Sequence, residues 1–245
     1  MLEPQSMAGK IVAVTGAGSG LGEATASAFE EAGSTVVWLD RNRDALARLE
    51  GRASPPHLVM ACDVSDEAQV DATIAEITAR YGRVDIVVNC AAVDHTYWVE
   101  QLTVEQWDQI IAVNLRGPFL MAKAVWPQMR EQGGGHIFNI ASTSAFRAAS
   151  GATAYTASKF GILGLSRALN LEGRQDNIRV TTVIPGGMRT HFFDRFVEQG
   201  IPMPDEAVLQ DPRNVANTIV FAAQMPHGSD VQEIVVTSPF ESGWP

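Results

Sequence analysis

Residues 10–22 of the chain read Lys-Ile-Val-Ala-Val-Thr-Gly-Ala-Gly-Ser-Gly-Leu-Gly. The apolar run at 10–15 predicts a buried strand, and the helical spacing at 21–32 predicts a helix that ends near Gly33. A strand, a glycine-rich turn and a helix in this order are typical of the phosphate-binding start of a dinucleotide-binding βαβ unit, although a purely structural turn is the alternative. The residues expected to hold the phosphates are Gly16, Ser19, Gly20, Leu21 and Gly22.

The same alternation of strand and helix continues along the chain. Further strands are expected at residues 35–39, 57–61, 85–88, 136–141, 178–184 and 231–236. Further helices are expected at residues 44–50, 66–81 and 152–172, and from Thr103 towards Arg130, where Gly117 and Pro118 should perturb the helix. Strands that alternate with helices predict an α/β, single-domain Rossmann fold, with a doubly wound parallel sheet of about seven strands and helices on both faces.

One domain is expected over residues 9–245, after a flexible N-terminal segment at 1–8. Residues 187–210 interrupt the alternation and are expected to form a substrate lid, either as a mobile segment or as a packed excursion. This range is called the lid segment below.

The composition of the 245 residues argues against several classes of partner. A formal net charge of −10 disfavours nucleic acid and anionic lipid as partners. No signal peptide and no apolar run of about 18 residues is visible, so a cytoplasmic location is expected. The histidines do not lie at metal-ligand spacing, so no metal site is predicted, and Cys62 and Cys90 are interpreted as small core residues.

Asp40 stands at the end of the second expected strand. A carboxylate at this place can accept hydrogen bonds from both ribose hydroxyls of NAD and would repel the 2′-phosphate of NADP. The neighbouring Arg41 and Arg43 leave NADP open as a less favoured cofactor, because an arginine can pair with that phosphate. Asp40 can also serve as a cap for the helix that follows it, and this is compatible with either cofactor.

Tyr155 and Lys159 lie four residues apart in the helix expected at 152–172, so they share one helix face. Ser142 precedes Tyr155 by 13 residues, at the end of the fifth expected strand. Together with the opening glycines and Asn114, these residues make the sequence resemble the short-chain dehydrogenase/reductase family over nearly its whole length.

The resemblance implies an oxidoreductase that moves a hydride between NAD(H) and a secondary alcohol or ketone. Tyr155 is then the acid/base, and Ser142 holds the substrate oxygen. A free tyrosine has a pKa of about 10, so the ammonium of Lys159 and the positive nicotinamide are expected to favour the phenolate. Asn114 is expected to reach Lys159 through water, with a satisfied buried amide as the alternative.

The resemblance also assigns further residues to the cofactor. Besides the opening glycines, Tyr155 and Lys159, these are Asp40, Arg41, Asp63, Val64, Asn89, Ala91, Pro185, Gly186, Met188 and Thr190. Asp63 has the alternative role of capping the next helix. Cys90 and Ala92 depart from the Asn and Gly that are usual in the family, and the segment from Ser238 to Trp244 departs from its usual Asp-Gly-Gly ending.

Three segments are expected to form the substrate pocket: residues 92–99, 143–151 and the lid segment. Beside Ser142 and Tyr155, the candidate contacts are His95, Phe146 and Phe192, which suggest an apolar pocket for a small-molecule alcohol or carbonyl. Arg147 and Arg189 remain candidates for binding an anionic group. The relatives imply a homo-oligomer, a tetramer or a dimer, and the unusual C-terminal segment leaves its geometry open.

Three other functions compete with this reading. One is an NADPH-dependent 3-oxoacyl-type reductase, and another is a dinucleotide-binding protein without turnover. A hydrolase is disfavoured because the chain contains no Gly-x-Ser-x-Gly motif.

Overall fold

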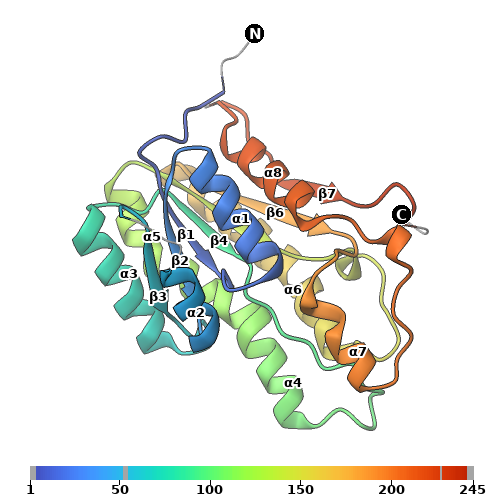
Figure 1. Cartoon of the computed structure of the whole chain (residues 1–245). Helices are drawn as coiled ribbons and strands as arrows, with labels where there is room; N and C mark the ends of the chain where they lie inside the picture. The colour runs from blue at the N-terminus through green and yellow to red at the C-terminus, as the bar shows by residue number, and fades with distance from the viewer. Residues whose placement is uncertain (1–3, 52–54, 227, 242–245) are drawn as a thin grey trace.

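Seven parallel strands form the centre of the computed structural model, which describes residues 4–51, 55–226 and 228–241. Within these residues the strand order is β3-β2-β1-β4-β5-β6-β7. The strands are β1 (Ile11–Thr15), β2 (Thr35–Asp40), β3 (Leu58–Ala61), β4 (Ile86–Asn89), β5 (Gly135–Ile140), β6 (Ile178–Pro185) and β7 (Glu233–Val236). The prediction of a doubly wound parallel sheet is therefore confirmed (Figure 1).

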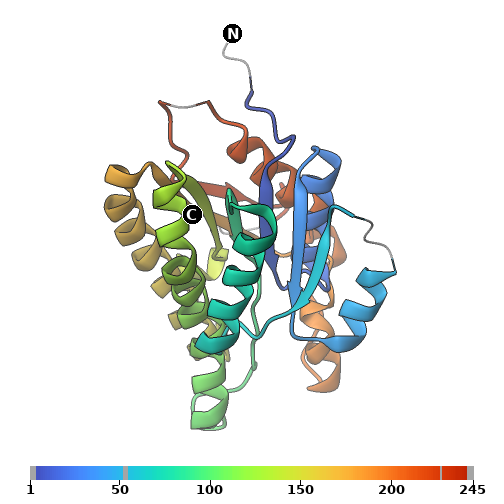
Figure 2. The same ribbon diagram turned by 90° about the vertical axis from the view of Figure 1, so that its left-hand side faces the viewer.

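Helices cover both faces of the sheet. They are α1 (Gly20–Glu31), α2 (Arg43–Glu50), α3 (Glu67–Tyr81), α4 (Val104–Ile111), α5 (Gly117–Glu131), α6 (Thr153–Gly173), α7 (Asp194–Glu198) and α8 (Pro212–Ala223). One apolar cluster joins the sheet to α3, α5 and α6, and a second joins it to α1, α2 and α8. Figure 2 shows these two layers on either side of the sheet.

Alternation along the strands explains the two clusters. Ala13 and Val37 belong to the first cluster, whereas Val12 and Val36 belong to the second, because neighbouring side chains in a strand point to opposite faces. Both faces are covered, so these strands consist of nearly continuous apolar residues. In the described part of the chain, no helix combines the length and the apolarity that crossing a membrane requires.

Several elements differ from the sequence prediction. Helix α8 was not predicted, although Asp211 caps it by accepting a hydrogen bond from Arg213 N, and Pro212 stands in its first turn. The last strand begins at Glu233 rather than at residue 231. Val231 precedes the strand and instead accepts a hydrogen bond through its carbonyl from the hydroxyl of Thr181 (2.5 Å).

The long helix expected after Thr103 is divided into two α-helices by a π-helical turn at Ala112–Arg116. This wide turn ends where Gly117 and Pro118 begin α5, so the expected perturbation lies just before these two residues. The turn places Asn114, which is 1% exposed, beside the carboxyl end of the sheet.

The two ends of the lid segment lie side by side. Gln210 N donates to Gly187 O (3.0 Å), and Arg189 N donates to Gln210 O (2.9 Å).

At the other end of the sheet, the N-terminal segment is anchored by Met7, which is 2% exposed, and by a hydrogen bond from Gln5 N to Gln224 O (2.8 Å). Residues 1–3 of the segment that the sequence predicts to be flexible lie outside the described residues.

Candidate active site

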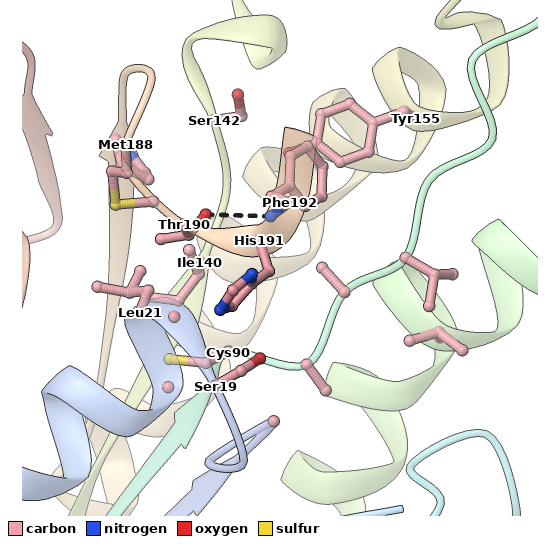
Figure 3. A pocket seen from close by; sticks show the side chains of 18 of the residues that line it. Ser19, Leu21, Cys90, Ile140, Ser142, Tyr155, Met188, Thr190, His191 and Phe192 are labelled. Atoms are coloured by element: carbon pink, nitrogen blue, oxygen red, sulfur yellow. Dashed lines mark hydrogen bonds between the residues drawn. The ribbon is translucent and has the colours of Figure 1, made fainter. Parts of the chain in front are cut away.

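A cavity of about 490 Å³ opens at the carboxyl ends of the strands. This is the expected place for a ligand, because the connections after β1 and β4 run to opposite faces of the sheet and leave a crevice between them. The predicted site residues that line the cavity are Gly16, Ser19, Gly20, Leu21, Gly22, Asp40, Arg41, Asp63, Val64, Ala91, Ser142, Tyr155, Lys159, Pro185, Gly186, Met188, Thr190 and Phe192. In Figure 3, Ser19 and Cys90 lie at one end of the view, and Ser142 and Tyr155 lie at the other.

Close packing of the backbone explains the glycines of the opening turn. A Cβ atom on Gly16 would lie 2.8 Å from the Cα of Ala91, and the φ angle of Gly16 is +65°. A Cβ atom on Gly22 would lie 2.0 Å from the carbonyl oxygen of Gly16. Ser19 begins α1 without making a side-chain capping hydrogen bond. The first N–H groups of α1 therefore face the cavity as an anion-binding helix terminus.

Asp40 sits at the rim of this cavity and organises the turn. Its Oδ2 accepts a hydrogen bond from Gly18 N, and its Oδ1 accepts one from Asn42 N, both at 2.8 Å. Asn42, not Asp40, caps α2, because the Asn42 side chain accepts hydrogen bonds from Asp44 N and Ala45 N. The alternative role of Asp40 as a helix cap is therefore wrong.

Arg41 and Asp63 face each other across the same rim, with 3.9 Å between Nη1 and Oδ2. Asp63 does not cap α3, since Asp66 is the cap. Its Oδ1 instead accepts hydrogen bonds from Ser65 N (2.9 Å) and Ser65 Oγ (2.6 Å).

Tyr155 and Lys159 point from α6 towards the cavity, as their spacing predicts. The Lys159 Nζ lies 5.5 Å from the centre of the Tyr155 ring and donates a hydrogen bond to Ile140 O (2.8 Å). Burial lowers the pKa of Lys159, which is 3% exposed, to about 8. Burial also raises the pKa of Tyr155 to about 12, and the hydroxyl of Ser142 opposes this rise. Without a bound cofactor, the pKa of Tyr155 is therefore raised by burial, and not lowered as we expected from the neighbouring Lys159.

Asn114 holds the backbone beside the catalytic helix. Its Oδ1 accepts a hydrogen bond from Val93 N and its Nδ2 donates to Val93 O, both at 2.8 Å. The Nδ2 group also lies 3.3 Å from the hydroxyl of Ser158, which in turn donates to Tyr155 O (2.7 Å). These contacts make Asn114 a satisfied buried amide, and its water-mediated link to Lys159 stays a prediction.

Besides Asn114, the predicted site residues Asn89, His95 and Phe146 are not among those that line the cavity. Asn89 is 4% exposed and donates a hydrogen bond to Asn139 Oδ1 (2.8 Å). His95 Nε2 lies 2.7 Å from Gln109 Oε1, and Phe146 is 42% exposed. Their roles towards cofactor and substrate remain predictions.

The two cysteines differ in their surroundings. Cys62 is 3% exposed and packs in the core, as expected, whereas Cys90 is half-buried and lines the cavity as well as contacting the core. Burial raises the pKa of the Cys90 thiol to about 12, so this thiol is protonated and unreactive near neutral pH. Among the described residues, no group of three or more potential ligands could hold a metal ion.

The lid segment places an aromatic ring beside Tyr155. The ring centres of Phe192 and Tyr155 lie 5.5 Å apart. Arg195 holds Phe192 in place, because its guanidinium lies 4.3 Å from the Phe192 ring centre and donates hydrogen bonds to Asp94 Oδ2 (2.5 Å) and Thr96 Oγ1 (3.0 Å). This clamp was not predicted from the sequence.

The C-terminal segment also reaches the site, through Glu241. Its carboxylate accepts hydrogen bonds from Arg147 Nη2 (2.5 Å), Thr143 Oγ1 (3.3 Å) and Gly187 N (3.2 Å). The only sequence signal for this contact was the departure of the C-terminal segment from the family pattern. Trp244, at the end of that segment, lies outside the described residues.

Comparisons with known proteins agree with this geometry. A model of the short chain dehydrogenase family matches residues 10–200. The D-threitol dehydrogenase of Mycolicibacterium smegmatis is 43% identical over 180 residues, which cover 72% of this chain and 69% of that protein.

Two solved structures are also similar. The 3-ketoacyl-(acyl-carrier-protein) reductase of Brucella melitensis, solved in complex with NADH, is 32% identical with a TM-score of 0.85, covering 94% of this chain and 98% of that one. An alcohol dehydrogenase of Thermococcus sibiricus shares the fold. Its identity to this chain is 24% and its TM-score is 0.85, covering 96% of this chain and 99% of that one.

Proposed function

Because this chain belongs to the short-chain dehydrogenase/reductase family, and is therefore an NAD(P)-dependent oxidoreductase, we propose that it transfers a hydride between NAD(H) and a neutral secondary alcohol or ketone. The observation that carries the proposal is the convergence of Tyr155, Ser142 and Lys159 on the cavity that also contains the glycine-rich turn. One cavity thus holds an acid/base and an anion-binding helix terminus.

The residues of the cavity fit a dinucleotide. Gly16, Ser19 and Gly20 present the start of α1 to a pyrophosphate, and Asp63 and Val64 line the wall that an adenine would contact. At the other end, Pro185, Gly186, Met188 and Thr190 line the wall proposed for the nicotinamide. When bound, the nicotinamide ring donates or accepts the hydride.

Asp40 supports NAD rather than NADP. Each of its oxygens accepts one backbone hydrogen bond, which leaves lone pairs for the two ribose hydroxyls. The carboxylate would repel a 2′-phosphate. Arg41 would do little to offset this repulsion of a 2′-phosphate, because its guanidinium already faces the carboxylate of Asp63 across the same rim.

The proton chemistry belongs to Tyr155. Ser142 holds the substrate oxygen by a hydrogen bond, and Tyr155 gives its phenolic proton to that oxygen during reduction or takes it during oxidation. A tyrosine with a pKa of about 12 is protonated near neutral pH, so it carries the proton that reduction requires, whereas oxidation requires the phenolate and therefore additional positive charge beside the phenol. Lys159 supplies part of that charge from 5.5 Å below the ring.

The substrate class follows from the lid and from the similarity to known enzymes. The aromatic ring of Phe192 lies beside Tyr155 and gives the cavity an apolar wall with room for a small molecule. Since D-threitol dehydrogenase is 43% identical to this chain, tetritols are the first alcohols to test.

An NADPH-dependent 3-oxoacyl reductase is the second candidate; the 32% identity to the Brucella melitensis reductase, solved with NADH, supports its substrate class and not its choice of NADPH. An acetoacetyl thioester tested with NADH and NADPH decides between the two. Higher kcat/KM for the thioester with NADPH than for any simple alcohol or ketone with NAD(H) would favour this second candidate.

Cofactor absorbance during turnover tests the proposal. A panel of tetritols, simple secondary alcohols and ketones is assayed with both cofactors, in the original protein and in Tyr155→Phe. The Tyr155→Phe variant should bind NADH normally and lose turnover by a factor of about 10² to 10⁴, because general acid–base catalysis contributes about that much. Tyr81→Phe is the matched control, since the Tyr81 hydroxyl bonds to Pro56 O far from the cavity (2.7 Å).

Two results would contradict the proposal. Near-normal turnover by Tyr155→Phe would reject its role as acid/base. No turnover of any panel member by the original protein, despite normal dinucleotide binding, would favour a dinucleotide-binding protein without catalysis.

We also propose that the protein is a homo-oligomer. Trp107, Phe119 and Phe160 on α4, α5 and α6 are exposed large apolar side chains, which an interface would cover. Light scattering after size-exclusion chromatography measures the number of subunits.

A further inference from the structure

Glu241 joins three segments that are far apart in the sequence. Its Oε1 accepts hydrogen bonds from Arg147 Nη2 and Thr143 Oγ1, in the loop after β5, and its Oε2 accepts one from Gly187 N, in the turn after β6. The side chain is only 10% exposed. One nearly buried carboxylate therefore ties the C-terminal segment to both loops of the catalytic cavity.

Gly186 leaves the space that this carboxylate fills. A Cβ atom on Gly186 would lie 1.8 Å from the Oε2 of Glu241, so any larger residue would push the carboxylate out. The backbone N–H of Gly186 donates to Val236 O (2.9 Å), which holds the C-terminal segment alongside. The fit of Glu241 is thus a built feature of this end of the cavity.

Arg147 does not line the cavity itself, but Glu241 links it to the cavity wall. Its guanidinium donates to the same oxygen that accepts from the hydroxyl of Thr143, and Thr143 lines the cavity next to Ser142. A guanidinium at this place is suited to bind a carboxylate of a substrate held at Ser142. In this chain, its partner is a carboxylate from the protein itself.

We propose that Glu241 is a specificity-determining residue, whose carboxylate occupies the place at Arg147 that the carboxylate of an anionic substrate would take. A second anion there would be repelled by Glu241 and would find Arg147 already paired. The pair therefore restricts the pocket to neutral alcohols and ketones. This inference rests on the proposed function, because it takes the space beside Ser142 and Tyr155 to be the substrate pocket.

Binding of butyrate and butyramide to the NADH-loaded protein tests the inference without any need for turnover. The two probes have nearly the same shape and differ in charge, and nicotinamide fluorescence reports their dissociation constants. Glu241→Gln keeps the size of the side chain and removes its charge. It should strengthen the binding of butyrate relative to that of butyramide by about fivefold or more, because the negative charge that faces the guanidinium of Arg147 is then removed.

Three further variants separate recognition of charge from general loosening of the site. Glu241→Gln combined with Arg147→Met should lose the gain, since the guanidinium at this place is then removed as well. Arg147→Met alone should weaken butyrate relative to butyramide. This variant tests the inference even where Glu241→Gln does not fold. Glu233→Gln is the matched control, because Glu233 pairs with Arg167 on the surface (2.7 Å) and its loss should leave the ratio unchanged.

The inference is overturned if Glu241→Gln leaves the butyrate to butyramide ratio unchanged, or if the gain persists without Arg147. A protein that turns over no alcohol but shows the predicted ratio shift would contradict the proposed function alone. A protein that turns over neutral alcohols without the ratio shift would contradict this inference alone.

Discussion

Replacing Lys159 by methionine should change how the stability of the protein depends on pH. Lys159 has a pKa of about 8 in the folded protein, against an ordinary value of 10.5, because burial penalises the ammonium. Below pH 8 the folded and unfolded chains both carry the proton, so the full cost of burying the charge is present. Between pH 8 and 10.5 the folded chain has lost the proton while the unfolded chain keeps it, and stability rises with pH.

The size of this pH dependence follows from the lowering of the Lys159 pKa. A difference of about 2.5 pKa units corresponds to about 3 kcal/mol, since one unit is worth about 1.4 kcal/mol. Lys159 is 3% exposed, so solvent screens this cost little. Methionine has a similar length and no charge. Between pH 7 and 10.5, the original protein should therefore gain about 3 kcal/mol of unfolding free energy relative to Lys159→Met.

Denaturant unfolding of both proteins at several pH values measures this gain. The hydrogen bond from Lys159 to Ile140 O is lost in the variant at every pH, so it shifts the two curves apart without changing their relative slope. The other titrating groups are common to both proteins and cancel in the comparison. A relative gain below about 1 kcal/mol would refute the reasoning, because it would mean that Lys159 keeps an ordinary pKa.

Two further substitutions test the cofactor end of the cavity and the packing of the opening turn. Asp40→Ala should weaken NAD binding by about tenfold more than NADP binding, because the variant loses the hydrogen bonds to the ribose and also the repulsion of a 2′-phosphate. Fluorescence titration with both reduced cofactors measures the two dissociation constants. Equal weakening of both cofactors would argue against ribose recognition by Asp40. Gly22→Ala should lower the unfolding free energy by about 3 kcal/mol, because its Cβ atom would meet the carbonyl oxygen of Gly16 at 2.0 Å. Gly164→Ala in α6 is the matched control: its Cβ atom would meet nothing within 4 Å, and it should stabilise the protein by up to about 1 kcal/mol in the same denaturant experiment.

Local patterns were sufficient to predict the order of strands and helices. Buried strands and amphipathic helices have sequence periods that are visible over ten to fifteen residues, so β1 to β6 and the helices that connect them were predicted close to their observed limits. Helix α8 was missed although Asp211 and Pro212 are ordinary signals for a helix start. That omission was a failure to use local information rather than a lack of it.

The position of Tyr155 beside Lys159 could be predicted because the two are neighbours on one helix, and their catalytic roles stay a prediction. The pairs that shape the substrate side could not be predicted in this way. Asp94 and Arg195 are 101 residues apart, and Arg147 and Glu241 are 94 residues apart, so their contacts depend on how loops pack after the sheet has formed. The raised pKa of Tyr155 has the same origin, because the extent of burial is a property of the folded chain.

The wide turn at Ala112–Arg116 has a consequence for how this part of the chain tolerates change in length. A π-turn contains an extra residue compared with the α-turns on either side. Because this wide turn already absorbs the extra residue, deleting one residue there would let α4 and α5 join as one regular helix with little rotation of the parts on either side. The amide of Asn114, which the wide turn holds against the backbone of Val93, would then lose its place and its two hydrogen bonds to that residue.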